Sequence, residues 1–142
     1  MTPAEIEWEF WKLCAVVDDL DRSHTCDVPG LEPHLLAILN FVKAHPEHES
    51  VFVNLFCQIG VRKDHLSPWI LHFCMRELRY PQVQDAVNEH FGKLGGVNGA
   101  PRLMNFVSDV NWVYSDDPWE DAMFFEYYWI KEHPGEDWPC RK

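Results

Sequence analysis

This chain contains an internal repeat: a unit of two apolar segments, each beginning at a proline, occurs twice, 35 residues apart. Proline is tolerated in the first turn of a helix, where its missing N–H has no partner to lose, and it disfavours helix in the residue before it. Each unit is therefore predicted to be two consecutive helices that begin at prolines. Three residues of the first unit recur at the same spacing in the second: Pro33 as Pro68, Pro46 as Pro81, and Phe56 as Phe91.

Apolar residues within these units follow the i, i+3, i+4, i+7 spacing of one helix face. The expected buried residues are Leu35, Ile38, Leu39 and Val42, then Phe52, Leu55, Phe56 and Ile59, then Leu71, Cys74, Met75 and Leu78, and last Val83, Ala86, Val87 and Phe91. With the segment Tyr80–Val87, this frame resembles HEAT-like repeats over Pro33 to Phe91. The resemblance implies stacked antiparallel helix pairs and attaches no activity to them.

Helix signals also occur on both sides of the repeated units. Thr2, Pro3 and Glu5 form a capping box that predicts a helix to about Leu20. A third unit is expected from Pro101, with a second helix from Trp119 to about Lys131, after a glycine-rich linker over 92–99. The sequence thus predicts one all-α domain over 1–142 with about seven helices. An N-terminal helix would precede three antiparallel hairpins, stacked as a short α-solenoid or compact bundle, and 132–142 would be an irregular tail.

The charge distribution restricts the partners that this chain can bind. The net charge is −11, and the acids gather at both ends: residues 1–30 hold seven acids and two bases, and residues 96–142 hold nine and four. Nucleic acids and anionic membranes are bound by basic patches. We therefore expect no nucleic-acid or membrane partner and favour a basic protein.

Cysteine usage and the apolar pattern indicate the compartment. The five cysteines are odd in number and contain no C-x-x-C, so they are predicted to be reduced thiols. We see no secretion signal at the start and no apolar run long enough to span a bilayer. These features predict a cytoplasmic protein with a folded core, since 46% of its residues are hydrophobic.

Two short segments carry residues that can bind metal. His24, Cys26 and Asp27 lie together in one expected loop, and His45 and His48 are three residues apart at a proline turn. A tetrahedral zinc site needs four converging donors, which neither segment supplies. The sequence therefore favours ordinary polar loops and leaves metal binding open at both segments.

The most enzyme-like cluster comprises Asp116, Asp117, Glu120 and Asp121. It resembles the aspartate-rich motif of helical prenyl-chain enzymes, which implies a shared divalent ion. Those folds are larger, their second metal-binding motif is missing here, and acids also complement the dipole of a helix N-terminus. A metal-dependent enzyme is therefore the least favoured alternative. We predict no enzyme activity and no cofactor, and we expect the thiols on apolar helix faces to be poor nucleophiles.

The strongest functional signal is the segment Asp109 to Trp138, where nine acids and one lysine accompany nine aromatic residues. Aromatic anchors ringed by carboxylates combine contact area with steering of a basic partner. The first helix adds Trp8 and Trp11, for which burial is favoured over an exposed aromatic surface. Its C-terminal end carries Asp18, Asp19 and Asp21, an unfavourable position for acids that suggests a contact with a partner. The predicted partner-binding residues are Asp109, Trp112, Asp116, Asp117, Trp119, Glu120, Asp121, Tyr127 and Tyr128.

These features predict an acidic helical protein-binding module. In style they resemble bacterial immunity proteins, several of which are compact, acidic and all-helical. This resemblance of class implies an inhibitor that neutralises a basic, toxin-like enzyme by direct binding. The alternative is a general helical-repeat adaptor or scaffold. An adaptor would place binding on the repeated units, at Arg62, Lys63, Arg76 and Arg79.

Overall fold

The computed structural model of the chain describes residues 1–24, 28–61, 66–115, 130–131 and 133–136. These residues contain helices and no strand, which confirms the predicted all-α class. No helix among them is both long and apolar enough to cross a bilayer. The elements are α1 (Pro3–Arg22), α2 (Val28–Ala44), η1 (Pro46–His48), α3 (Glu49–Gly60), α4 (Pro68–Leu78), α5 (Pro81–Lys93), α6 (Gly96–Gly99), η2 (Pro101–Leu103) and α7 (Met104–Tyr114). Most of the predicted final helix and most of the predicted tail lie outside the described residues. Residues 133–136 of the tail are described and form a turn, not a helix.

The first helix begins as the capping box predicts. The Glu5 backbone N–H donates to Thr2 Oγ1 at 3.2 Å, and the Thr2 backbone nitrogen donates to Glu5 Oε1 at 3.1 Å. Two N–H groups that the helix itself cannot satisfy therefore gain acceptors. Pro3 occupies the first turn, as expected.

Two helix boundaries differ from the prediction. α2 begins at Val28, so Pro33 lies inside this helix and does not open it. The earlier start buries Leu31 one turn before the buried Leu35, and this added core contact offsets the backbone hydrogen bond that proline cannot make. The glycine-rich linker is also partly helical, because residues Gly96–Gly99 form α6.

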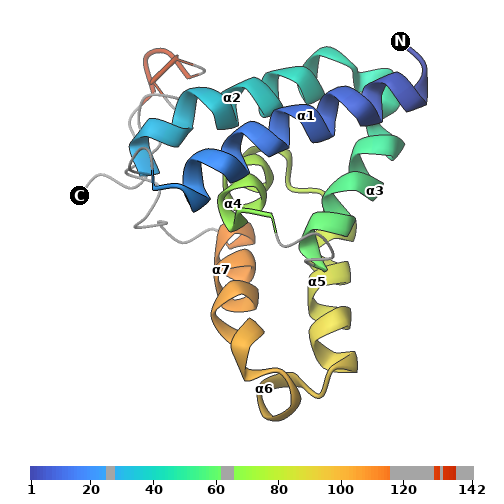
Figure 1. The fold of residues 1–142 in the computed structure, drawn as a ribbon, viewed down its shortest axis with the longest axis vertical. Helices are drawn as coiled ribbons and strands as arrows, with labels where there is room; N and C mark the ends of the chain where they lie inside the picture. The colour runs from blue at the N-terminus through green and yellow to red at the C-terminus, as the bar shows by residue number, and fades with distance from the viewer. Residues whose placement is uncertain (25–27, 62–65, 116–129, 132, 137–142) are drawn as a thin grey trace.

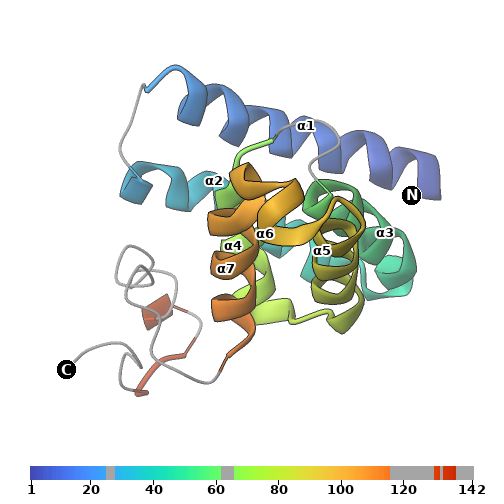
Figure 2. The ribbon, with the colours of Figure 1, turned by 90° about the horizontal axis from the view of Figure 1, so that it is seen from below.

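The helices pair differently from the antiparallel arrangement expected within each unit. α1 and α2 lie side by side and run in opposite directions, as Figure 1 shows. α5 and α7 lie side by side below them, and α6 connects their lower ends (Figures 1 and 2). α3 packs mainly against α5, and α4 packs mainly against α7. The closest helix neighbours therefore come from different units, and the HEAT-like interpretation stays a prediction.

One hydrophobic core holds these helices together. Phe10 of α1 packs edge-to-face against Phe56 of α3, with ring centroids 5.2 Å apart, and also contacts Phe52 at 6.0 Å. The predicted stripes of α2 and α3 are buried throughout, and those of α4 and α5 are buried except for half-buried positions at Leu78, Ala86 and Phe91. The apolar periodicity therefore identified the core correctly.

Candidate functional site

The acidic and aromatic surface predicted near the C-terminus is only partly described. Asp109 and Trp112 lie on the outward face of α7, where Trp112 is 47% exposed and Met104, two turns away, is also exposed. Two large apolar side chains therefore reach solvent on this helix. The remaining predicted residues lie outside the described residues: Asp116, Asp117, Trp119, Glu120, Asp121, Tyr127 and Tyr128.

Trp8 is exposed, contrary to the predicted burial. Its side chain is 69% exposed, more than any other large apolar side chain among the described residues. α1 buries Ile6 and Phe10. Trp8 lies two residues from each of them, which is about half a turn of a helix with 3.6 residues per turn, so it points to the opposite side. Trp11, by contrast, is half-buried and packs edge-on against Phe10 at 5.2 Å. The periodicity contained this signal, since Trp8 lies off the apolar stripe.

A groove of ≈ 420 Å³ lies between the N-terminal half of α1 and α3; we call it the α1–α3 groove. Its lining residues are Pro3, Ala4, Glu7, Ser50, Val51, Asn54, Leu55 and Gln58. Trp8 does not line this groove, but it follows the lining residue Glu7 directly and lies one helical turn from Ala4. A large exposed aromatic side chain beside a mixed polar and apolar groove is typical of a protein-binding surface.

The helix that carries Trp8 is strongly acidic. Six acids and two bases lie on α1, a net charge of −4. Both bases pair with acids of the same helix: Lys12 with Glu9 at 3.3 Å, and Arg22 with Asp18 at 2.9 Å. The surface around Trp8 is therefore negative.

Asp21 does not face a partner, which corrects the prediction. Its Oδ2 accepts a 2.7 Å hydrogen bond from Ser67 Oγ, and the Ser67 hydroxyl oxygen accepts one from the Trp69 backbone N–H at 3.4 Å. Ser67 is the N-cap of α4. The carboxylate therefore lies at the N-terminal end of a neighbouring helix, where negative charge is stabilising.

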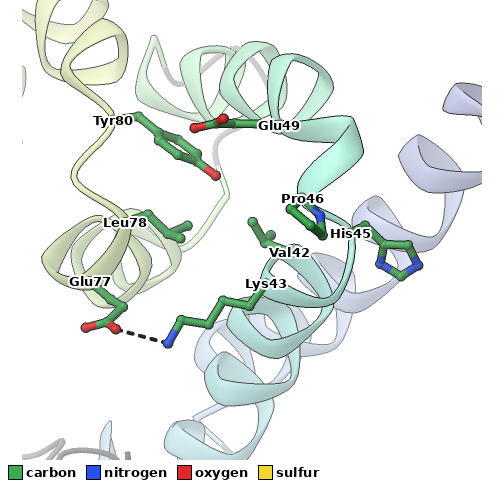
Figure 3. A pocket seen from close by; sticks show the side chains of 8 residues that line it. All are labelled: Val42, Lys43, His45, Pro46, Glu49, Glu77, Leu78 and Tyr80. Atoms are coloured by element: carbon green, nitrogen blue, oxygen red, sulfur yellow. Dashed lines mark hydrogen bonds and ion pairs between the residues drawn. The ribbon is translucent and has the colours of Figure 1, made fainter.

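A second recess, of ≈ 340 Å³, lies between the end of α2, the start of α3 and the end of α4. Figure 3 shows its lining residues, which are Val42, Lys43, His45, Pro46, Glu49, Glu77, Leu78 and Tyr80. We call it the Tyr80 pocket. Lys43 Nζ pairs with Glu77 Oε1 at 3.0 Å on one side of it. Burial, and secondarily the nearby Glu49 carboxylate, raise the pKa of Tyr80 to about 12, so its phenol stays neutral at physiological pH.

The described metal candidates do not converge. His45 Nδ1 lies 2.9 Å from the Phe41 carbonyl oxygen, whereas His48 Nε2 lies 3.1 Å from the Met1 carbonyl oxygen. In the part of the chain that the structure describes, no three His, Cys, Asp or Glu side chains are grouped to hold a metal ion. Cys26 and Asp27 lie outside that part, so metal binding near His24 stays open.

Three cysteines among the described residues are free thiols with raised pKa values. Burial raises the pKa of Cys14, Cys57 and Cys74, and the Asp18 carboxylate adds to this effect at Cys14. Thiols of this kind are protonated at neutral pH and are poor nucleophiles. Cys57 and Cys74 therefore have the raised pKa expected from the apolar helix faces, and their low nucleophilicity stays a prediction.

Two arginines of the adaptor alternative have a structural role. Arg76 Nη1 donates to the carbonyl oxygens of Val113 and Ser115, each at 3.1 Å. Arg79 reaches the carbonyl oxygens of Tyr114 and Ser115 at 3.5 and 3.4 Å. Positive charge at the C-terminal end of α7 complements its dipole. These side chains connect α4 to α7, which weakens the case for a partner site there.

No protein-family model, curated protein or solved structure matches this chain.

Proposed function

We propose that this protein is a binding module for a basic protein and that α1 forms the central contact. The observation that supports the proposal best is the 69% exposure of Trp8, which follows the groove residue Glu7 on a helix of net charge −4. Tryptophan is enriched among the residues that dominate binding energy at interfaces. Because the Trp8 side chain is exposed to water, it contributes nothing to the hydrophobic core.

Charge decides the kind of partner. The chain has a net charge of −11, and both bases of α1 are already paired within the helix. Charged residues around an aromatic anchor act mainly on the rate of association and on the choice of partner. A basic protein is attracted to this surface, whereas an acidic protein or a nucleic acid is repelled.

The most specific form of the proposal is an inhibitor or immunity-type protein that neutralises a basic, toxin-like enzyme. Direct occlusion of the enzyme by an acidic helical surface requires no catalysis by the inhibitor. The C-terminal surface around Trp112 is the competing position for the same function, since it too combines an exposed tryptophan with nearby acids.

The experiment compares the two surfaces directly. Wild-type protein, Trp8→Ala and Trp112→Ala are each used as bait in a lysate of the native host at low and high salt. We expect one basic protein to be captured by wild type and Trp112→Ala at low salt, and to be lost with Trp8→Ala. The captured protein is then purified and its binding to each variant measured by surface plasmon resonance.

Truncation of a central tryptophan anchor is expected to weaken the complex by about 2 kcal/mol or more, which is roughly 30-fold in Kd. Glu7→Lys, which reverses an exposed charge in the groove, should slow association at low salt and have little effect at high salt. Capture that depends on Trp112 and not on Trp8 would place the site on α7. Capture of an acidic protein would refute the electrostatic basis of the proposal.

A further inference from the structure

We infer that the Tyr80 pocket binds a guanidinium or ammonium group carried on an apolar stem, supplied by an arginine or lysine side chain of the basic partner. The inference rests on the proposed function for the source of this cation, and it adds a second contact. Both recesses border the first turn of α3, the Tyr80 pocket at Glu49 and the α1–α3 groove at Ser50. One partner can therefore contact both.

The shape of the pocket suits a long side chain with a polar tip. Val42, Pro46 and Leu78 form apolar walls, and their side chains surround the opening drawn in Figure 3. The volume of ≈ 340 Å³ is at the lower end of the range of small-ligand sites, which starts at about 300 Å³. Lysine and arginine have apolar stems that pack against such walls while the charged tip reaches polar groups.

The charges that line the pocket favour a cation. Glu77 is paired with Lys43 at 3.0 Å, so these two side chains largely neutralise each other. Glu49 then contributes an additional negative charge, and its carboxylate lies beside the Tyr80 ring in Figure 3. An anionic ligand would meet both carboxylates, whereas a guanidinium group would gain a charge-assisted hydrogen bond to Glu49.

The Tyr80 hydroxyl is the second, independent indication of a ligand. The side chain is only 9% exposed, and its hydroxyl points into the pocket, as Figure 3 shows. Among the described residues, none forms a hydrogen bond with this hydroxyl; the bond from Tyr114 goes to the Tyr80 backbone carbonyl at 2.7 Å. A phenol oxygen in this position can accept from an N–H donor, and the ring can contact the cation.

The test uses a probe that does not depend on the partner. Butylguanidinium is titrated into the isotope-labelled full chain, and backbone amide shifts are followed by NMR, with uncharged butylurea as the matched ligand. We expect shifts in residues 42–49 and 77–80 with a Kd of about 1 mM, the strength of a few weak contacts. Butylurea should bind at least about tenfold more weakly, because it lacks the charge.

Two variants and two controls separate the pocket from the rest of the surface. Glu49→Gln and Tyr80→Phe keep the shape and should each weaken butylguanidinium binding, by about tenfold for the charge and severalfold for the hydroxyl. Glu47→Gln removes a charge that is also exposed and lies two residues away, outside the lining, and should change Kd by less than about twofold. Trp8→Ala should leave probe binding unchanged, so a failure of the proposed α1 surface can be distinguished from a failure of this pocket.

A capped pentapeptide with arginine at its centre and the free diamine putrescine then distinguish the two sources of the cation. Tighter binding of the peptide supports a partner side chain. Tighter binding of putrescine would overturn that source in favour of a small amine. Equal shifts with butylurea, shifts spread over the whole acidic surface, or an equal effect of Glu47→Gln and Glu49→Gln would each overturn the pocket itself.

Discussion

The same substitution is expected to have opposite effects at two helical glycines, Gly60 and Gly92. Gly60 is the last residue of α3, where this helix passes α5. A Cβ added at Gly60 would lie 2.7 Å from Val87 Cγ2 and 3.6 Å from Leu71 Cδ1. Carbon atoms normally approach to about 3.5–4.0 Å, so Val87 would have to move. Val87 is buried and β-branched, and therefore holds one preferred rotamer in a helix.

Gly60→Ala should lower the free energy of unfolding. Overpacking of a well-packed core typically costs about 1–3 kcal/mol, and the gain in helix propensity from glycine to alanine is at most about 1 kcal/mol. The net destabilisation is therefore expected to be about 1–2 kcal/mol. Gly92 lies one residue from the end of α5 with nothing within 4 Å of its added Cβ, so Gly92→Ala should stabilise by up to about 1 kcal/mol.

Urea unfolding followed by far-ultraviolet circular dichroism measures both changes. The double variant Gly60→Ala with Val87→Ala tests the cause, because removing the Val87 methyl groups should relieve the clash. Its destabilisation should be smaller than the sum of the single effects by about 1 kcal/mol. A Gly60→Ala protein as stable as wild type, or additive effects in the double variant, would show that the α3–α5 contact is looser than the structure indicates.

Three further predictions concern the hydrogen bonds that fix helix ends and the buried phenol. Arg76→Ala should destabilise by about 2–3 kcal/mol in urea unfolding, and Arg79→Ala by less than about 1 kcal/mol, since the bonds of Arg79 are longer and more exposed. Thr2→Ala should cost about 1 kcal/mol. An NMR titration should show the lowered pKa of Glu5 rising only in part, because alanine keeps the backbone N–H that is its larger cause and removes only the side-chain hydrogen bond. The pKa of Tyr80 is raised from 10.0 to about 12, so its neutral form contributes to the free energy of unfolding. That contribution is complete below pH 10 and is lost as pH rises to about 12. Tyr80→Phe should therefore lose less stability than wild type at alkaline pH, as measured by urea unfolding.

Features that depend on a few neighbouring residues could be predicted from the sequence. The start of α1 is defined by contacts between Thr2 and Glu5, three residues apart, so a local pattern identifies it. The buried stripe of α3 follows from helix periodicity, because a helix covers its apolar face whichever neighbour it meets. The all-α class depends on these local signals and was predicted correctly.

Helix partners depend on contacts between distant residues, which a single sequence does not contain. The prolines at 46 and 81 mark turns, but they do not set the angle at which the next helix leaves. α3 therefore packs mainly against α5, and α2 against α1, although the sequence suggested pairing within each unit. The helix start predicted at Pro33 was wrong for a related reason. Leu31 gains a core contact when α2 begins earlier, at Val28, and a single sequence does not reveal that contact.

For the exposure of Trp8, helix periodicity is a better guide than the average burial of tryptophan. Tryptophan is buried on average, and this prior favoured the core. Its position relative to Ile6 and Phe10 instead directs it to solvent. The candidate α1 surface could thus be predicted by a stricter use of the helix angle, whereas the groove beside it could not, because α3 contributes most of its lining.

Asp21 shows how a local misfit can be a tertiary signal. Acids at the C-terminal end of a helix are unfavourable beside its negative dipole, so Asp21 suggested a contact outside the fold. The contact exists, but Ser67 within the chain provides it, 46 residues away and at the N-terminus of α4. The charge that is misplaced on one helix is correctly placed for another. An acid at an unfavourable helix position on this chain can therefore have its partner within the fold. The binding proposal depends instead on Glu7 and Trp8, because both are exposed on α1 and Glu7 lines the α1–α3 groove.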